Sequence, residues 1–225
     1  MFFFKKHPTY QSSGFFNGFT DYHCHILPGV DDGVKTMNQA LEILAEYERL
    51  GVETVWLTPH VMEDVPNTTE GLRLRFQALK AAYTGGVDLH LAAEYMLDGL
   101  FDQRLSSSDL LPLGANSDMV LVETSYFNPP LNMEATLHDI MSHGFFPVLA
   151  HPERYRYIAD IEGYRRLKRM GVKFQMNLGS IAEVYGTTAR KKALMLMKEG
   201  AYDYTGTDLH NIHLLHTILE TKIPK

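Results

Sequence analysis

Strand-like and helix-like segments alternate along all 225 residues, and this alternation limits the possible folds more than any other feature. The segments expected to form strands are 19–25, 53–58, 87–94, 119–123, 146–151, 172–177 and 202–207. Several of them are almost continuously apolar, which is typical of strands buried on both faces of a parallel sheet. The pattern therefore predicts an α/β fold.

Amphipathic segments lie between the strand candidates, and the helices expected from them span 37–50, 69–83, 133–143, 161–170 and 187–199. A glycine follows a helix and precedes a strand at four places, the usual position of a C-cap: Gly51, Gly144, Gly171 and Gly200. Residues 98–117 are expected to form a short helix and a loop. The seven units favour a closed or nearly closed (β/α) barrel, with an open doubly wound sheet as the alternative.

No Pro/Ser-rich linker or charge block divides the chain, so we expect one domain over residues 18–225. Residues 1–17 lack a clear period and are expected to be a flexible leader, with a short docking segment as the alternative. No apolar run reaches the roughly 18–20 residues that cross a bilayer, and the aromatic start precedes Lys5 and Lys6, the reverse of a secretory signal. These features predict a cytoplasmic protein without a transmembrane segment.

The charge balance disfavours one class of partner. The chain has 21 lysines and arginines against 27 acidic residues, a net charge of −6 with neutral histidines. A protein that binds duplex DNA through a broad basic face would carry the opposite balance. We therefore expect no nucleic-acid partner.

Histidines and carboxylates occur where most of the predicted strands end, and the βα loops that begin there form the reactive rim of a (β/α) barrel. The motifs at these positions are His23-Cys24-His25 followed by Asp31-Asp32-Gly33, Thr58-Pro59-His60, Glu94, Glu123, His151-Pro152-Glu153-Arg154, and Thr207-Asp208-Leu209-His210. Taken singly, each motif has an ordinary structural explanation as a turn or a strand end. Their common position at strand ends predicts a metal site.

The residue types indicate which metals would bind. Residues two apart in a strand point to the same side, so His23 and His25 can face the barrel axis together while Cys24 faces away. The chain has 11 histidines but one cysteine, which excludes a Cys₄ site and an intrachain disulfide. Imidazole and carboxylate ligands suit Mn²⁺, Fe or Zn²⁺, and their number is sufficient for two or three ions.

The motifs also carry a family resemblance. The run from Asp21 to Gly33 resembles the opening motif of the polymerase-and-histidinol-phosphatase (PHP) superfamily, and within it the bacterial capsule and exopolysaccharide tyrosine-protein phosphatases. Further matches follow in order: Thr58-Pro59-His60, Ala150-His151-Pro152-Glu153-Arg154-Tyr155, Gln175-Met176-Asn177-Leu178-Gly179-Ser180 and Thr207-Asp208-Leu209-His210-Asn211. The resemblance implies a distorted (β/α)7 barrel of the PHP type with a trinuclear, usually manganese-dependent, metal centre.

Carried over residue by residue, the resemblance implies nine metal ligands: His23, His25, Asp32, His60, Glu94, Glu123, His151, Asp208 and His210. It implies that Arg154 binds the substrate phosphate, and Asp208 and His210 are further catalytic candidates. A second arginine is usual in the family after the final Asp-x-His, but the stretch 211–216 has none. His213 or His216 would have to take its place.

Phosphatases that use a cysteine nucleophile need an arginine six positions after it, and the residue six positions after Cys24 is Val30. This spacing excludes the cysteine route. The resemblance implies a metal-dependent protein-tyrosine phosphatase, acting on a bacterial tyrosine kinase that controls capsule or exopolysaccharide synthesis. Two alternatives stay open at this stage. One is a PHP phosphoesterase for a small molecule such as histidinol phosphate, and the other is a metal-bound regulatory module without catalysis.

Overall fold

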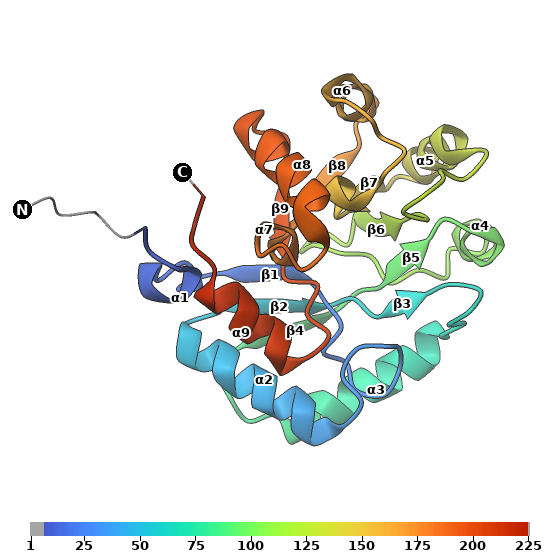
Figure 1. The fold of residues 1–225 in the computed structure, drawn as a ribbon. Coiled ribbons are helices and arrows are strands. Elements are labelled where there is room, and N and C mark those ends of the chain that lie inside the picture. The colour runs from blue at the N-terminus through green and yellow to red at the C-terminus, as the bar shows by residue number, and fades with distance from the viewer. Residues whose placement is uncertain (1–6, 225) are drawn as a thin grey trace, which may run out of the picture.

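The structure, a computed structural model, describes residues 7–224 and has an α/β fold in which the named strands pair in parallel (Figure 1). One sheet has the order β1-β2-β4, formed by Thr20–Cys24, Thr54–Leu57 and Asp88–Leu91. The other has the order β3-β5-β6-β7-β8-β9, formed by His60–Val61, Glu94–Met96, Met119–Glu123, Phe146–Ala150, Lys173–Asn177 and Tyr204–Gly206. The predicted α/β class is confirmed.

The two sheets adjoin along β1 and β9. The backbone N–H of His25 donates to the carbonyl of Leu209 over 2.9 Å, and the N–H of Asp208 donates to the carbonyl of His23 over 2.7 Å. On the other side, β2 is followed after two residues by β3, and β4 by β5, so the chain itself passes from one sheet to the next. The strands therefore form one curled parallel arrangement.

The second and third predicted strands each differ from the observed elements. Residues 87–94 were expected to form one strand that ends at Glu94, but β4 ends at Leu91 and Glu94 begins β5. The physical reason is a change of neighbour, because β4 pairs with β2 whereas β5 pairs with β3 and β6. His60, expected at a strand end, begins β3 and lies opposite Glu94 in that pairing.

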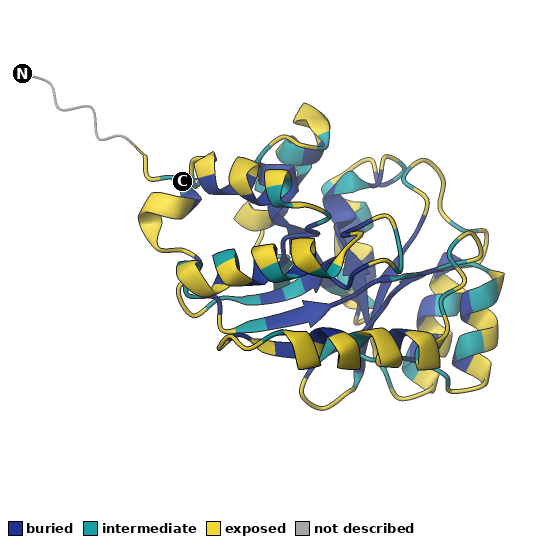
Figure 2. Ribbon diagram, turned by 90° about the horizontal axis from the view of Figure 1, so that it is seen from below, coloured by how far each residue is buried: buried dark blue, intermediate teal, exposed yellow. Residues whose placement is uncertain are grey.

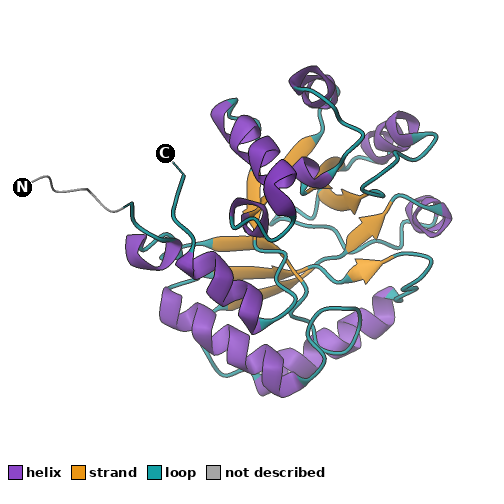
Figure 3. Cartoon of the chain, in the orientation of Figure 1, coloured by secondary structure: helices purple, strands orange, loops and turns teal. Residues whose placement is uncertain are grey.

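The helices lie around the strands (Figure 3). They are α1 (Tyr10–Ser13), α2 (Met37–Leu50), α3 (Thr69–Ala82), α4 (Gly99–Ser106), α5 (Met133–Ser142), α6 (Ile161–Arg169), α7 (Leu178–Ile181), α8 (Gly186–Lys198) and α9 (Ile212–Glu220), with a 3₁₀ turn, η1, at Pro152–Arg154. The predicted helix 37–50 matches α2, and α4 is the short helix expected within 98–117. All four predicted C-cap glycines have positive φ angles, for example 82° at Gly51. Gly51 is the C-cap of α2, whereas Gly144, Gly171 and Gly200 each follow the cap residue by one position.

Part of the expected leader is packed against the domain. Residues 1–6 lie outside the described part of the chain, but Tyr10 and Phe16 are 2% and 1% exposed and join the hydrophobic core. The N–H of Tyr10 also donates to the carbonyl of Thr221 over 2.9 Å. The prediction of a flexible leader is therefore wrong for the segment from Tyr10 to Phe16, where aromatic side chains gain burial against the C-terminal segment.

The buried residues follow the strands and the inner faces of the helices, whereas the outer helix faces are exposed (Figure 2). In α2, for example, Ala40, Ile43, Leu44 and Tyr47 form the buried stripe. No helix within residues 7–224 combines the length and the apolar character that spanning a membrane requires.

Candidate metal centre

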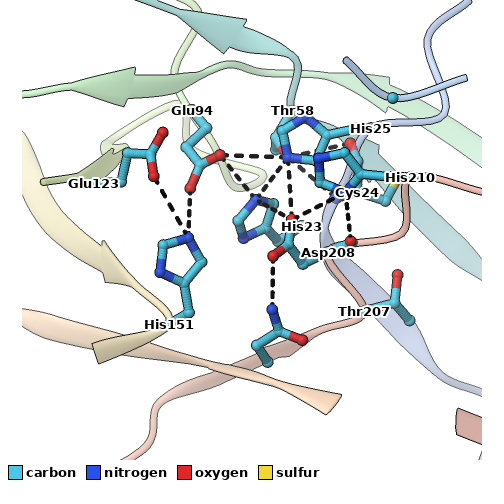
Figure 4. Close-up of polar contacts among 12 residues, drawn as sticks. His23, Cys24, His25, Thr58, Glu94, Glu123, His151, Thr207, Asp208 and His210 are labelled. Atoms are coloured by element: carbon cyan, nitrogen blue, oxygen red, sulfur yellow. Dashed lines mark hydrogen bonds and ion pairs between the residues drawn. The ribbon is translucent and has the colours of Figure 1, made fainter. Parts of the chain in front are cut away.

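The nine residues that the sequence predicts as ligands lie together in the structure, in a largely buried cluster of imidazoles and carboxylates. Figure 4 labels all of them except Asp32 and His60. Eight of them are contributed by strands β1, β3, β5, β6, β7 and β9 or by residues within four positions after these strands, and Asp32 is contributed by the loop after β1. His23, His25, Glu94, Glu123, His151 and Asp208 are at most 2% exposed. Asp32, on the loop before α2, has its side chain 71% exposed.

Glu94 occupies the centre of this cluster. Its Oε2 lies 3.2 Å from Nε2 of His23 and 3.3 Å from Nε2 of His25. The same oxygen lies 3.1 Å from Nδ1 of His60, and Oε1 lies 3.0 Å from Nε2 of His151. One carboxylate therefore contacts four imidazoles contributed by three different parts of the sequence.

Three overlapping groups have ligand atoms within 4.8 Å of one another: His25, Asp32, His60 and His210; His23, His25 and Glu94; and His60, Glu94 and Glu123. His25, His60 and Glu94 each belong to two groups. This sharing of ligands is what a site for two or three closely spaced cations requires, with carboxylates that bridge them.

Unsatisfied buried atoms support the fit to cations. Among residues 7–224, Nδ1 of His60 and Oε2 of Glu94 are buried and lie 3.1 Å apart, but neither atom forms a hydrogen bond of suitable geometry. Leaving one such atom unpaired costs roughly 1–3 kcal/mol. A divalent cation would coordinate the Glu94 oxygen and the His60 nitrogen, and its ligand preferences match the nitrogen and oxygen donors present.

Charges within the cluster shift the pKa values of its members. Burial lowers the pKa of His23, but the neighbouring carboxylates of Glu94 and Asp208 outweigh it and raise this pKa to about 9. Burial raises the pKa of Asp208, but His23 and His25 outweigh it and hold this pKa well below its usual value. His23 therefore holds a proton and Asp208 a negative charge near neutral pH, and a bound cation would take the place of the proton on His23.

Polar partners behind the cluster fix the orientation of its imidazoles. Nδ1 of His23 lies 2.8 Å from Oε1 of Gln175, so its Nε2 faces the cluster. Nδ1 of His25 lies 2.8 Å from Oδ2 of Asp31, the first aspartate of the Asp31-Asp32 pair. Asp31 thus turns away from the ligand groups, while Asp32 joins them. Hydrogen bonds of this kind orient metal-binding histidines and raise their basicity.

Arg154 lies beside the cluster in a fixed orientation. Its guanidinium carbon is 4.3 Å from the ring centre of Tyr126 and 3.9 Å from that of Tyr185. Its Nη1 donates to Oδ2 of Asp208 over 2.8 Å. Asn177 Nδ2 and the Tyr185 hydroxyl donate to the same oxygen over 2.7 and 3.2 Å. The side chain is therefore held in one plane by two rings and one carboxylate.

A pocket of about 270 Å³ opens over the cluster, and Arg154, Tyr126, Tyr185 and Leu214 line it together with six residues of the cluster. Arg154 is the one arginine in the described chain that lines this pocket. His213 and His216 are exposed on α9 and do not line it, so neither takes the place of the missing second arginine.

Two residues of the cluster have backbone conformations that are rare for side-chain-bearing residues. His151 has φ 34° and Asp208 has φ 52°, both in the left-handed region. Such a conformation costs of order 1–3 kcal/mol and persists where surrounding contacts enforce it. Both residues contact Arg154: its backbone N–H donates to the carbonyl of His151 over 2.9 Å, and its Nη1 donates to Oδ2 of Asp208.

The roles of three polar residues had not been anticipated. Gln175 and Asn177 lie on β8 within a stretch that carried the family resemblance, whereas Tyr185 precedes α8 and no local pattern marks it. Cys24, by contrast, is fully buried, and burial raises the pKa of its thiol well above the usual value, as expected for a residue outside the chemistry.

Comparisons with known proteins agree with this geometry. Tyrosine-protein phosphatase YwqE of Bacillus subtilis is 29% identical over 197 residues, covering 85% of this chain and 77% of YwqE. Tyrosine-protein phosphatase CpsB of Streptococcus pneumoniae is 28% identical over 204 residues, covering 85% and 83%. The putative tyrosine-protein phosphatase CapC of Staphylococcus aureus is 24% identical over 197 residues, covering 85% and 77%.

A solved structure supports the same assignment. It belongs to the crystal structures of YwqE from Bacillus subtilis and CpsB from Streptococcus pneumoniae, unique metal-dependent tyrosine phosphatases. It matches with a TM-score of 0.80 and 27% identity, covering 89% of this chain and 85% of that chain. The family described as capsular polysaccharide synthesis, CpsB/CapC, matches residues 19–217. This confirms the resemblance seen in the sequence: the chain belongs to the CpsB/CapC family.

Proposed function

We propose that the chain is a metal-dependent protein-tyrosine phosphatase that hydrolyses phosphotyrosine on a bacterial tyrosine kinase controlling capsule or exopolysaccharide synthesis. The observation that carries the proposal is the single pocket in which Arg154 lies beside the buried imidazole and carboxylate cluster. The relatives that match most of the chain are named tyrosine-protein phosphatases, which supports this substrate class. A cytoplasmic location is part of the proposal, because the kinase that would be the substrate uses ATP, which is available in the cytoplasm.

We further propose that the strands form a distorted (β/α)7 barrel of the PHP type within a single domain. The contact of β1 with β9 and the continuity of β2 with β3 and of β4 with β5 support this arrangement. The domain would begin earlier than residue 18, since Tyr10 and Phe16 join its core.

The nine clustered residues would hold two or three divalent ions, with Mn²⁺ as the first metal to test and Fe and Zn²⁺ as alternatives. The ligand set is His23, His25, Asp32, His60, Glu94, Glu123, His151, Asp208 and His210. When bound, such ions would supply an acidified water as the nucleophile and positive charge for the phosphate oxygens.

Arg154 would bind the phosphate of the substrate. Its guanidinium is planar, and the stack between Tyr126 and Tyr185 fixes the plane before substrate arrives. Asp208 uses one N–H of Arg154, which leaves the others for two phosphate oxygens. This preorganisation suits phosphoryl transfer, in which positioning and charge stabilisation contribute most of the acceleration.

Neither Asp208 nor His210 is placed to donate a proton to the leaving group, which favours an aryl phosphate as substrate. Oδ2 of Asp208 accepts from three donors and neighbouring imidazoles keep its pKa low, so Asp208 acts as an acceptor that positions Arg154. His210 directs Nδ1 at the carbonyl of Asp208 over 2.8 Å and leaves Nε2 for a cation. A tyrosine phenolate, with a pKa of about 10, leaves with less protonation than a serine alkoxide needs.

Hydrolysis assays with controlled metal content test the proposal. The chelated protein should not hydrolyse a phosphotyrosine peptide, and Mn²⁺ should restore turnover. Full activity after exhaustive chelation would contradict a metal-dependent mechanism. A higher kcat/KM for histidinol phosphate than for the peptide would indicate a small-molecule phosphoesterase, and bound metal without turnover of either substrate would indicate a regulatory module.

A further inference from the structure

A second, larger cavity of about 720 Å³ continues from the metal pocket along the molecule. The two share three lining residues, namely Tyr126, Arg154 and Tyr185. Beyond them, the larger cavity runs between the loop after β6, which carries Phe127, and the first turn of α8 at Thr187. We call this larger cavity the side groove. A molecule that places a phosphate beside Arg154 can therefore extend into it.

The side groove is positively charged although the whole chain carries a net charge of −6. Arg154, Arg156 and Lys192 line it, and the one acidic lining residue is Glu153. Glu153 is 1% exposed, accepts from Tyr202 over 2.9 Å and does not face solvent. The first turn of α8 contains no acidic residue, so the helix dipole adds to the positive potential at this end.

Arg156 is the cation in the groove that stays available to a ligand. Lys192 donates to the carbonyls of Tyr155 and Ile158 over 2.6 and 2.7 Å, which ties it to the loop. Arg156 is exposed and forms no ion pair with any residue in the range 7–224. Its guanidinium carbon lies 4.7 Å from the ring centre of Phe127, whose side chain is 60% exposed.

Several basic residues on nearby surfaces are instead held in ion pairs. On α6, Arg165, Arg166 and Lys168 each form an ion pair, with Glu199, Glu134 and Asp203 respectively. Arg190 of α8 pairs with Glu183. Arg156 instead rests on an aromatic ring beside the substrate pocket, with its N–H groups directed to no carboxylate of the described chain.

We infer that the side groove binds the peptide segment flanking the phosphotyrosine, with Arg156 selecting an acidic side chain near that residue. The inference rests on the proposed function, since a phosphotyrosine peptide must be the substrate. An extended peptide advances about 3.3–3.6 Å per residue, so three residues on one side of the phosphotyrosine reach about 10 Å along the groove. Phe127 supplies an apolar surface for the aliphatic part of the same segment.

A peptide series tests the inference. Each peptide has one phosphotyrosine among alanines, and a single glutamate is moved through three positions on either side. For the wild-type enzyme loaded with Mn²⁺, glutamate at one or two of these positions should raise kcat/KM about two- to fivefold over the all-alanine peptide, the range of a solvent-exposed ion pair. The preference should shrink in high salt because the charges are screened.

Two variants of Arg156 test the inference, and one variant of Arg75 serves as the control. In Arg156→Ala the ratio of kcat/KM for the glutamate and alanine peptides should fall to about one. In Arg156→Glu, a peptide with lysine at the same position should have a higher kcat/KM than the glutamate peptide. Arg75, exposed on α3 away from both pockets, provides the matched control, and Arg75→Ala should keep the wild-type ratio. Because each ratio compares two substrates of one enzyme, small changes in catalysis or folded yield cancel.

Two results would overturn the inference while leaving the proposed function intact. One is equal hydrolysis of all peptides by the wild type, and the other is a glutamate preference that survives in Arg156→Ala. If the loaded wild type hydrolyses none of the peptides and no small aryl phosphate either, the proposed function itself fails.

Discussion

Arg154 and Asp208 form an ion pair in which the two oxygens of one carboxylate serve different neighbours. Oδ2 of Asp208 accepts from Nη1 of Arg154 over 2.8 Å, while Oδ1 lies 3.3 Å from Nε2 of His25 and 3.5 Å from Nε2 of His23. Asp208 is 2% exposed, so both contacts lie largely outside water. The carboxylate therefore connects the residue proposed to bind phosphate with the residues proposed to bind metal.

Replacement of Arg154 should impair catalysis without removing the metals. We expect Arg154→Ala to lower kcat/KM for a phosphotyrosine peptide about 10- to 100-fold, the value of one or more hydrogen bonds to a charged group. Arg154→Lys should restore little, because an ammonium cannot offer two parallel N–H groups or stack in the same way between Tyr126 and Tyr185. Metal content, measured by mass spectrometry of the purified variants, should match the wild type. Wild-type kcat/KM in Arg154→Ala would contradict the role.

The number of ligand groups that share a residue should determine how many ions its replacement removes. Glu94 belongs to two of the three groups, whereas Asp32 belongs to one. We expect Glu94→Ala to lose more metal per chain than Asp32→Ala does, when both are loaded with Mn²⁺, desalted and analysed by mass spectrometry. Circular dichroism should show that both variants are folded. Equal metal loss from the two variants would show that the cluster does not divide as these groups suggest.

Sequence patterns were sufficient for much of the fold where the signals are local. Helix α2 has matched bounds because Thr36 and Gln39 form a capping box at its start and Gly51 adopts a left-handed conformation at its end. Helix α9 was not predicted although Asn211 caps it through the N–H of Leu214.

Features that depend on partners distant in sequence could not be predicted in this way. The division of residues 87–94 into β4 and β5 follows from different neighbouring strands, which a single apolar run does not reveal. Likewise, Tyr185 joins the site through a ring contact with Arg154 and a hydrogen bond to Asp208. Strand-end histidines and acids could be found because strand ends share one rim, whereas Tyr185 comes from the segment before α8.

The melting temperatures of the metal-free and metal-loaded proteins should respond differently to pH. The carboxylates of Glu94 and Asp208 outweigh burial and raise the pKa of His23 from 6.5 to about 9. A raised pKa contributes stability that is complete below about pH 6.5 and is lost as pH approaches about 9. The melting temperature of the chelated protein should therefore fall across this window.

With saturating Mn²⁺, the melting temperature should hold or rise over the same window, because metal binding requires unprotonated imidazole and releases protons. Thermal melts at matched ionic strength measure both trends. In His23→Gln the fall seen for the chelated protein should become shallower. Parallel trends for the chelated and loaded wild type would contradict proton–metal competition at this site.

Asp31 should influence metal affinity although it lies outside the ligand groups. Its Oδ2 lies 2.8 Å from Nδ1 of His25 and accepts the backbone N–H of His60 over 3.1 Å, and its Oδ1 accepts the N–H of Gly33 over 3.0 Å. We expect Asp31→Asn to weaken Mn²⁺ binding about 10- to 100-fold, since a neutral amide orients His25 less firmly and lowers its basicity. Titration calorimetry on the chelated protein measures the affinity. Saturating Mn²⁺ should recover most of the activity of Asp31→Asn, whereas Arg154→Ala should stay impaired at any Mn²⁺ concentration. Unchanged affinity in Asp31→Asn would mean that the hydrogen bonds of Asp31 shape the loop without affecting metal binding.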